Sequence, residues 1–239
     1  MAEFVELSGN IFRSVCELLV VTVNCEGVMG AGIALDAKLR WPGVFQQYET
    51  ECQSDSLRIG TNILIRENGN DVSRNVICFP TKDRWRNPSK ISYIKAGLED
   101  LKTKVKEHHI RSIAMPHLGC SNGGLQWSEV KPHIETTLGD LPSLRVELWN
   151  FVEERDDPDF AKLITLLRDS DKSAATQQLR LQPRQFNSLV SALRLEGVRG
   201  LSSLQRAPGV GEKTLAAVYR FLFPTQSELR QPQQLGFDL

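Results

Sequence analysis

Two hydrophobic patterns alternate along the first 150 residues of the chain. Short apolar runs rich in β-branched residues predict strands, and longer segments with apolar residues every three or four positions predict helices. Strands are expected at residues 4–7, 11–12, 18–23, 62–65, 76–79, 113–115 and 144–149. Helices are expected at residues 33–39, 44–51, 91–105 and 129–138. This alternation predicts an α/β domain of three layers with a mixed, largely parallel sheet.

The composition of the chain changes after residue 151. A charged, proline-containing segment at residues 153–159 forms a joint, and Asp159 can cap a further helix at residues 160–167. Residues 169–178 are polar and rich in Ser, Ala and Gln, which is typical of a linker. We therefore expect a first domain at residues 1–170, a linker at 171–180, a small α-helical domain at 181–224 and a loosely ordered tail at 225–239.

Three predicted strands run directly into glycine-rich or polar loops. These loops are Asn24 to Gly32, Pro80 to Asp83 and Pro116 to Gly124. If the strands are parallel, all three loops lie at one carboxyl edge of the sheet, where open α/β domains bind ligands. The glycines of the first loop precede a helix and suit a phosphate cradle, although an ordinary strand-to-helix turn has the same layout. Their order, G-x-x-G-x-G, does not match the dinucleotide-binding fingerprint.

Composition limits the possible partners and cofactors. The 239 residues carry no formal net charge, so any nucleic-acid site must be local rather than a property of the whole chain. Five cysteines are scattered without metal-binding spacing, which favours a reducing, cytoplasmic compartment and predicts no metal site and no cofactor. We see no signal peptide and no apolar run long enough to span a bilayer, so we expect no membrane partner. We also expect a monomer.

The C-terminal region has a local positive charge. Between residues 175 and 230 there are eight basic and three acidic residues, a net charge of +5. Residues 204–214 precede a helix at 215–223 and are not a P-loop, because Glu212 stands where that motif needs glycine. They resemble a helix-hairpin-helix motif, whose glycine hairpin offers main-chain N–H groups to a DNA phosphate. The expected DNA contacts are Arg206, Gly209, Gly211, Lys213 and Thr214. The alternative is a helical bundle whose glycine turn binds a protein.

Three separated motifs carry a resemblance to a known family. They are residues 24–35, Phe79-Pro80-Thr81-Lys82 with Trp85-Arg86, and Leu118 to Leu125. With these motifs in this order, the first 150 residues resemble the macrodomain family and, within it, the DarG-type DNA ADP-ribosyl glycohydrolases, which are antitoxins. The resemblance implies a macrodomain fold, an ADP-ribose pocket and hydrolysis of the bond joining ADP-ribose to a DNA base. The implied partners are ADP-ribose, ADP-ribosylated DNA and a cognate DNA ADP-ribosyltransferase.

The resemblance also implies roles for individual residues. Lys82 corresponds to the catalytic lysine of the family, which attacks the anomeric carbon or activates the opened sugar; alone, it would be interpreted as a solvated surface lysine. Asn24 suits a hydrogen bond to the distal ribose, or it organises its own turn. Trp85 and Arg86 suit contacts with a DNA base and a phosphate, or they are a packed aromatic and a rim charge. The remaining expected ADP-ribose contacts are Cys25, Val28, Met29, Gly30, Ala31, Gly32, Ile33, Thr81, His117, Leu118, Gly119, Cys120, Ser121, Asn122, Gly123 and Gly124.

Two residues in or beside the third loop bear on the mechanism that the resemblance implies. In the branch of the human terminal ADP-ribose protein glycohydrolase, an aspartate in the third loop assists the lysine, whereas Gly123 stands at that place here. His117 lies beside the same loop, but a lone histidine is more often structural, so it is not expected to be catalytic. Two other functions stay open: a reader that binds ADP-ribose without cleaving it, and an antitoxin that acts mainly by binding its toxin through the C-terminal region.

Overall fold

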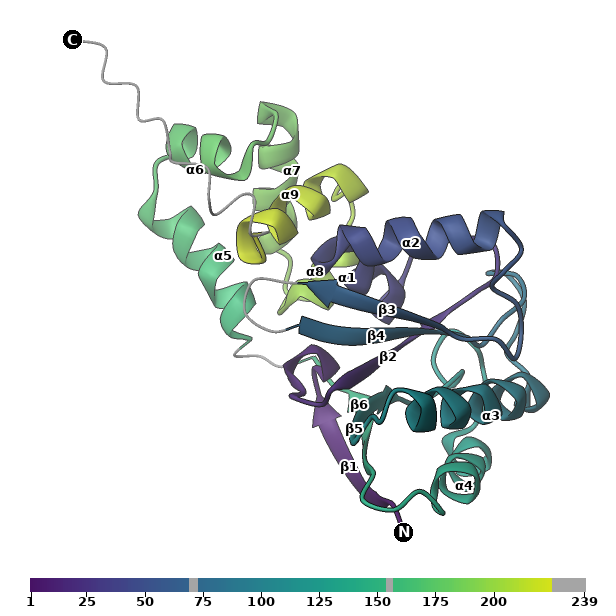
Figure 1. Ribbon diagram of the computed structural model, residues 1–239. Helices are drawn as coiled ribbons and strands as arrows, with labels where there is room; N and C mark the ends of the chain where they lie inside the picture. The colour runs from purple at the N-terminus through teal and green to yellow at the C-terminus, as the bar shows by residue number, and fades with distance from the viewer. Residues whose placement is uncertain (69–72, 154–156, 225–239) are drawn as a thin grey trace. The chain divides into compact units, whose positions relative to one another are not determined.

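The computed structural model describes residues 1–68, 73–153 and 157–224, which form two compact units (Figure 1). The first, here called the α/β unit, contains residues 1–67 and 73–153. The second, here called the helical unit, contains residues 157–224. The tail expected at residues 225–239 lies outside the described residues.

The α/β unit is built on one six-stranded sheet. Its strands are β1 (Glu3–Gly9), β2 (Leu18–Val23), β3 (Ile63–Asn68), β4 (Ser73–Pro80), β5 (Ser112–Pro116) and β6 (Arg145–Phe151). They lie in the order β1-β6-β5-β2-β4-β3. The pairs β1–β6, β5–β6, β2–β5 and β2–β4 are parallel. The prediction of a largely parallel sheet is therefore confirmed, and β2 lies inside it with a parallel neighbour on each side.

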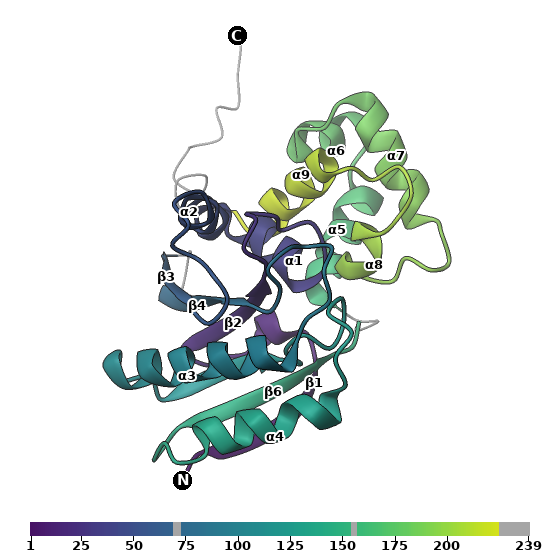
Figure 2. The same ribbon diagram turned by 90° about the vertical axis from the view of Figure 1, so that its right-hand side faces the viewer.

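Helices cover both faces of this sheet (Figure 2). The helices α1 (Gly32–Arg40) and α2 (Pro42–Gln53) lie on one face, and α3 (Ile91–Glu107) and α4 (Trp127–Leu138) lie on the other. Strand β2 supplies both cores, because successive side chains of a strand point to opposite faces. Leu18 and Val20 pack with α3 and α4, whereas Leu19, Val21 and Val23 pack with α1 and α2. The three-layer prediction is confirmed.

One predicted strand is wrong. Residues 11–12 form part of a 3-10 turn, Ile11–Arg13, instead of a strand. The side chain of Asn10 accepts a hydrogen bond from the main-chain N–H of Phe12 at 3.1 Å, and this local bond favours a turn over an extended segment. Two apolar residues are too few to tell a short strand from a turn by their pattern.

The helical unit contains five helices among the described residues. They are α5 (Pro158–Asp169), α6 (Lys172–Leu179), α7 (Pro183–Leu193), α8 (Leu201–Gln205) and α9 (Glu212–Leu222). Helix α6 occupies most of the segment expected to be a linker, and the carboxylate of Asp171 caps it by accepting from the N–H of Ala174 at 2.9 Å. The compact units divide before α5, and the domain limits at residues 170, 180 and 224 stay predictions.

Within the described residues, every helix is too short or too polar to cross a lipid bilayer.

Gly97 of α3 packs against the ring of Phe79 on β4, and it provides a test of the fold. A Cβ atom at Gly97 would collide with the ring of Phe79 on β4. We expect Gly97→Ala to destabilise the α/β unit by about 1–3 kcal/mol through overpacking, although alanine is the better helix former. Urea unfolding followed by tryptophan fluorescence measures this, since all four tryptophans lie in the α/β unit.

The matched control is Glu99→Ala, on the exposed side of the same helix. It should change the free energy of unfolding by no more than about 0.5 kcal/mol. An unfolding midpoint for Gly97→Ala equal to or above that of the wild type would contradict the observed packing of α3 on β4.

Candidate active site

Three loops leave the carboxyl edge of the sheet close to one another. We call residues 24–31 the first loop, residues 81–90 the second and residues 117–126 the third. The first two start side by side, because Val23 and Pro80 are partners in the register of β2 and β4. The N–H of Thr81 continues this pairing by donating to the carbonyl of Val23 at 3.0 Å. The register of β2 and β4 therefore places the starts of the first and second loops next to each other, as expected.

Asn24 organises the first loop from within. Its side chain is 7% exposed and turns back on the loop that follows it. Oδ1 accepts from the N–H of Glu26 at 2.9 Å, and Nδ2 donates to the carbonyl of Val28 at 2.6 Å. From α2, the hydroxyl of Tyr48 donates to the carbonyl of Asn24 at 2.9 Å. The structure thus shows the turn-forming role of Asn24, and its contact with a ribose stays a prediction.

The end of the first loop presents main-chain groups at the start of α1. Gly30, Ala31 and Gly32 are all exposed, and no side chain caps the N-terminus of this nine-residue helix. Gly32 has φ +58°, a conformation that favours glycine. Uncapped N–H groups and the helix dipole together favour an anion at this place. Met29, by contrast, is 1% exposed and packs in the core beneath the loop.

Lys82 joins the second loop to the third. Its side chain is half-buried, and Nζ donates to the carbonyl of Asn122 at 2.5 Å and to that of Trp85 at 3.4 Å. Each acceptor is a main-chain oxygen, which can orient the amine but does not exchange a proton with it. Lys82 is thus held at the junction of two loops. The alternative interpretation, a solvated surface lysine, would have its amine extending into solvent.

Two further contacts join the second loop to the first. The N–H of Cys25 donates to the carbonyl of Asp83 at 3.1 Å. The carboxylate of Glu26 accepts from the N–H of Trp85 at 2.9 Å. The second loop is also fixed internally, because the N–H of Arg84 and the amide of Asn87 both donate to the carboxylate of Asp83. Hydrogen bonds from Asn87 and Arg84 hold the pKa of this carboxyl below its usual value.

The third loop packs so closely on the second that Gly123 has no room for a side chain. A Cβ atom there would collide with the carbonyl oxygen of Gly119 and with the hydroxyl of Ser89. Ser89 is 5% exposed, and its N–H donates to the carbonyl of Gly123 at 2.9 Å. The structure therefore leaves no space for the aspartate that the other branch of the resemblance carries at this position.

The third loop also reaches the first. A Cβ atom built on Gly32 would lie 3.5 Å from Nδ2 of Asn122. Asn122 therefore links all three loops, because its side chain approaches the start of α1 and its carbonyl holds the amine of Lys82. The arrangement offers a primary amine, main-chain donors and amide groups. Among the described residues, no group of three His, Cys, Asp or Glu side chains is placed to hold a metal ion.

Comparison with known proteins agrees with this geometry. The sequence profile of the macro domain family matches residues 20–134. The solved macrodomain of Mycobacterium tuberculosis DarG is 41% identical, with a TM-score of 0.59 over 62% of this chain and 97% of that chain. The chain belongs to the macrodomain family. The matched residues 20–134 include all three loops.

Two similar curated proteins are named DNA ADP-ribosyl glycohydrolase. The protein of this name from Mycobacterium tuberculosis (strain ATCC 25618 / H37Rv) is 44% identical over 137 residues, which are 57% of this chain and 39% of the relative. The one from Thermus aquaticus is 36% identical over 192 residues, which are 80% of this chain and 49% of the relative. The chain thus spans less than half the length of these relatives. The longer match exceeds the α/β unit and so extends into the helical unit.

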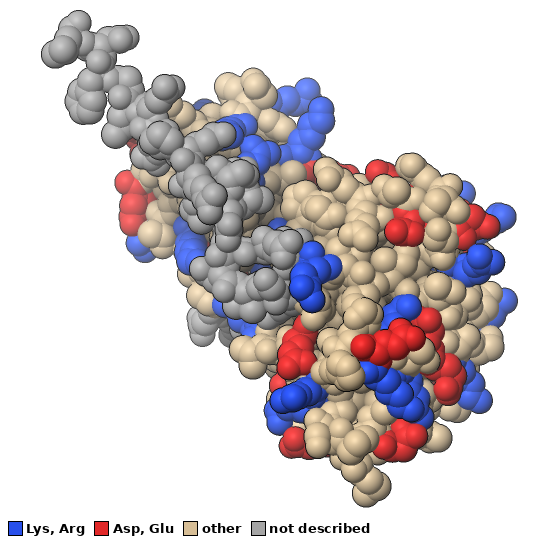
Figure 3. Space-filling view, viewed as in Figure 1, with Lys and Arg blue, Asp and Glu red and all other residues tan. Residues whose placement is uncertain are grey.

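Trp85 and Arg86 lie on the surface of the macrodomain. Trp85 is 49% exposed, and the guanidinium of Arg86 stacks 4.6 Å from its ring centroid. Lys, Arg, Asp and Glu side chains are interspersed over the face of the α/β unit that Figure 3 shows. Trp85 lies within the second loop. An exposed aromatic ring can stack on a nucleobase, and contact with DNA stays a prediction.

His117 is held by an aromatic neighbour. Its ring stacks on Trp127 of α4 with the centroids 3.8 Å apart and the planes 9° from parallel. Burial lowers the pKa of His117, while the charge of Glu6 opposes that effect, so the neutral ring is favoured. The stack gives His117 a packing role in the macrodomain.

Three residues that the motifs did not single out shape the macrodomain site. Tyr48 supports Asn24 from α2, Glu26 fixes Trp85, and Ser89 fills the space beneath Gly123. Glu26 lies inside the first motif, so its polar side chain in a glycine-rich loop could have indicated a role in the site. Tyr48 and Ser89 lie outside the motifs. Tyr48 contacts Asn24, 24 positions away in the sequence, and Ser89 contacts Gly123, 34 positions away, and no local sequence pattern reveals such contacts.

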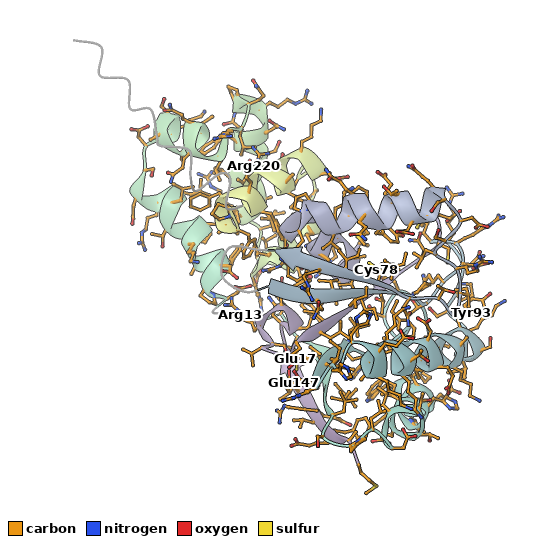
Figure 4. All side chains as sticks on the ribbon, in the orientation of Figure 1. Arg13, Glu17, Cys78, Tyr93, Glu147 and Arg220 are labelled. Atoms are coloured by element: carbon orange, nitrogen blue, oxygen red, sulfur yellow. The ribbon has the colours of Figure 1, made fainter. Side chains whose placement is uncertain are left out.

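The predicted pocket residues therefore divide into groups. Lys82, Asn24, Cys25, Gly32 and Asn122 are brought together by the contacts described above. Thr81, Leu118 and Met29 are buried behind the loops. The expected DNA contacts of the C-terminal region belong to the helical unit. Figure 4 shows all side chains, with Cys78 on β4 of the macrodomain and Arg220 on α9 of the helical unit.

Two thiols of the macrodomain loops provide a test of site burial. Burial raises the pKa of Cys25 from 9.0 to about 11, with smaller effects of Cys52 and nearby acids, and burial also raises that of Cys120 to about 11. Because the thiolate is the nucleophile, we expect both to react with iodoacetamide about 100-fold more slowly at pH 8 than a thiol of pKa 9. The rates should rise about tenfold per pH unit until the pH approaches 11. Peptide mass spectrometry measures them.

The same chain unfolded in urea is the control, because all five thiols should then react at similar rates. Modification of Cys25 or Cys120 at pH 8 as fast as in the unfolded chain would show that these loops do not bury the thiols.

Proposed function

We propose that the macrodomain hydrolyses the bond between ADP-ribose and a nucleobase of DNA, and so reverses the action of a DNA ADP-ribosyltransferase. The observation that carries this proposal is the position of the Lys82 amine, held where the second and third loops meet. The names of the relatives support the choice of reaction and substrate. The five free cysteines suit a reaction in the reducing cytoplasm.

ADP-ribose would bind across the three loops. Its pyrophosphate suits the start of α1, where Gly30, Ala31 and Gly32 are exposed and no side chain caps the helix. The exposed Ser121 and Asn122 supply donors from the third loop. The distal ribose would then lie beside Lys82, since Asn122 approaches Gly32 with its side chain and Lys82 with its carbonyl.

The chemistry takes place at the anomeric carbon of that ribose. The bond between this carbon and the base nitrogen breaks, water supplies a hydroxyl to the carbon, and a proton returns to the base. The transition state has oxocarbenium character, so a positioned amine lowers the barrier by attacking the anomeric carbon or by activating the opened sugar. The carbonyls of Asn122 and Trp85 aim Nζ, and loss of these contacts would free the amine to react.

Substitution of Lys82 tests the mechanism. Incubation of an ADP-ribosylated oligonucleotide with the wild-type protein should release ADP-ribose, and Lys82→Ala should slow this release by about 100-fold or more. Binding of free ADP-ribose to Lys82→Ala, measured by calorimetry, should change much less than turnover because the phosphate contacts come from other loops. Lys90→Ala, at an exposed lysine of the second loop, is the matched control and should keep turnover.

The outcomes separate the alternatives. If the wild type binds ADP-ribose but releases none from DNA, the protein is a reader and the enzymatic proposal is wrong. If Lys82→Ala turns over at the wild-type rate, only the role of Lys82 is wrong.

Asn24 and Asn62 form a pair that separates function from stability. Both are buried, at 7% and 2% exposure, and Asn62 donates from Nδ2 to the carbonyl of Gly97 at 2.7 Å, away from the three loops. Replacing either by alanine should cost about 1–3 kcal/mol of stability, because buried groups lose their partners. We expect only Asn24→Ala to reduce turnover strongly, since only Asn24 shapes the first loop.

Turnover per folded molecule and urea unfolding of both variants make this comparison. Equal turnover of Asn24→Ala and Asn62→Ala, at similar stability, would limit Asn24 to a structural role.

A further inference from the structure

Hydrolysis at an anomeric carbon needs a group that takes a proton from water. In both routes open to Lys82, the oxygen of a water molecule bonds to the anomeric carbon of the distal ribose, and this water loses a proton. The carbonyls that hold Nζ of Lys82 accept hydrogen bonds but take no proton. The close packing around Gly123 leaves no room for a carboxylate in the third loop. The proton acceptor must therefore come from another part of the site.

The three loops carry two carboxylates, Glu26 in the first loop and Asp83 in the second. The carboxylate of Asp83 serves its own loop, because Oδ1 accepts from the N–H of Arg84 at 2.8 Å and from the amide of Asn87 at 3.1 Å. The hydrogen bonds from Asn87 and Arg84 hold the pKa of Asp83 below its usual value, which makes this carboxylate a weaker base. Glu26 is left as the better candidate.

The thiols and the histidine of these loops are less suitable. Burial raises the pKa of Cys25 and of Cys120 to about 11, so both thiols stay protonated near neutral pH. The ring of His117 stacks on Trp127 of α4, on one face of the sheet, whereas the first loop leads into α1 on the other face (Figure 2).

Glu26 contacts the same residue that holds the amine of Lys82. Its main-chain N–H donates to Oδ1 of Asn24 at 2.9 Å, which fixes its position in the first loop. Its Oε2 accepts from the N–H of Trp85 at 2.9 Å, and the carbonyl of Trp85 accepts from Nζ of Lys82 at 3.4 Å. Because both contacts are made with the main chain of one residue, Oε2 lies within about 10 Å of Nζ.

The space between these two groups suits a water molecule and a reacting carbon. Among the contacts of the described residues, Glu26 and Lys82 form no ion pair with each other. In glycoside hydrolysis, catalytic groups about 6.5–9.5 Å apart leave room for a water beside the anomeric carbon. Glu26 is exposed, and its Oε1 has no partner in the described part of the chain. This oxygen can accept from water while Oε2 keeps its bond to Trp85.

We propose that Glu26 is the general base of the macrodomain reaction, an inference that rests on the proposed function. As the oxygen of water bonds to the anomeric carbon, the carboxylate takes a proton from that water, and the electron pair of the breaking bond passes to the nucleobase nitrogen. The carboxyl group then gives its proton to this nitrogen. If the amine of Lys82 attacks first, its proton passes to the departing nucleobase. The water that later breaks the bond to Nζ then gives its proton to Glu26, which returns it to Nζ.

Glutamine at position 26 removes the proton acceptor and keeps the contact between the loops, because an amide oxygen still accepts from the N–H of Trp85. We expect Glu26→Gln to lower kcat for release of ADP-ribose from an ADP-ribosylated oligonucleotide by about 100-fold, with little change in KM. The matched control is Asp83→Asn, which also removes a loop carboxylate and keeps both hydrogen bonds to Oδ1. It should keep the wild-type kcat. Urea unfolding checks that both variants fold.

Chemical rescue separates proton transfer from positioning. Glu26→Ala should be as slow as Glu26→Gln, and formate, a small carboxylate that can take a proton, should raise its kcat by about tenfold or more. Formamide has a similar size and accepts a hydrogen bond without taking a proton, so it should not restore turnover.

Wild-type kcat in Glu26→Gln would overturn the proposal. Equal rescue of Glu26→Ala by formate and formamide would also overturn it, because Glu26 would then only position Trp85. If the wild type releases ADP-ribose while either result is found, the proposed function stands and only the role of Glu26 is wrong. If the wild type releases none, both the proposed function and this inference are wrong.

Discussion

The candidate site depends on the parallel pairing of β2 with both β4 and β5. A strand in this position is buried on both faces, and the five apolar residues of Leu18–Val23 accordingly pack alternately into two cores. Because all three strands point the same way, their carboxyl ends deliver three loops to one edge. The pairing of Val23 with Pro80 then places Asn24 and Thr81 at the starts of neighbouring loops. This register brings the first and second loops together, and the packing of the loops then determines the contacts of Lys82 and Asn24.

Elements with a clear period could be predicted from the sequence, and those determined by single polar contacts could not. The apolar run Leu18–Val23 and the helical repeat of α3 follow from burial alone, so their limits agree with the structure within two residues. The 3-10 turn Ile11–Arg13 depends on one side chain, Asn10, and was mistaken for a strand. Helix α6 has a polar sequence, and its cap at Asp171 was a weaker signal than the Ser, Ala and Gln that suggested a linker.

The candidate site could be located from the sequence but not assembled from it. Loop sequence correctly placed Asn24, Lys82 and Asn122 at one edge, since that needs only strand order and direction. It did not reveal that Asn24 turns inward or that Lys82 bonds the carbonyl of Asn122 forty positions away. Contacts of this length depend on how the loops pack. The motif marks residue types that suit the chemistry, whereas packing decides which of them face a ligand and which hold the loops.

The fit of Ser89 beneath Gly123 has a consequence for the chemistry of Lys82. A carboxylate at position 123 would give the amine a partner able to accept its proton, but the space for any side chain is taken by Ser89 and the carbonyl of Gly119. The partner of Lys82 from this loop is instead the carbonyl of Asn122, which accepts a hydrogen bond and takes no proton. A proton leaving the amine must therefore pass to water, to the substrate or to another side chain. In the proposed reaction, the third loop would contribute geometry, and the group that takes this proton would come from outside that loop.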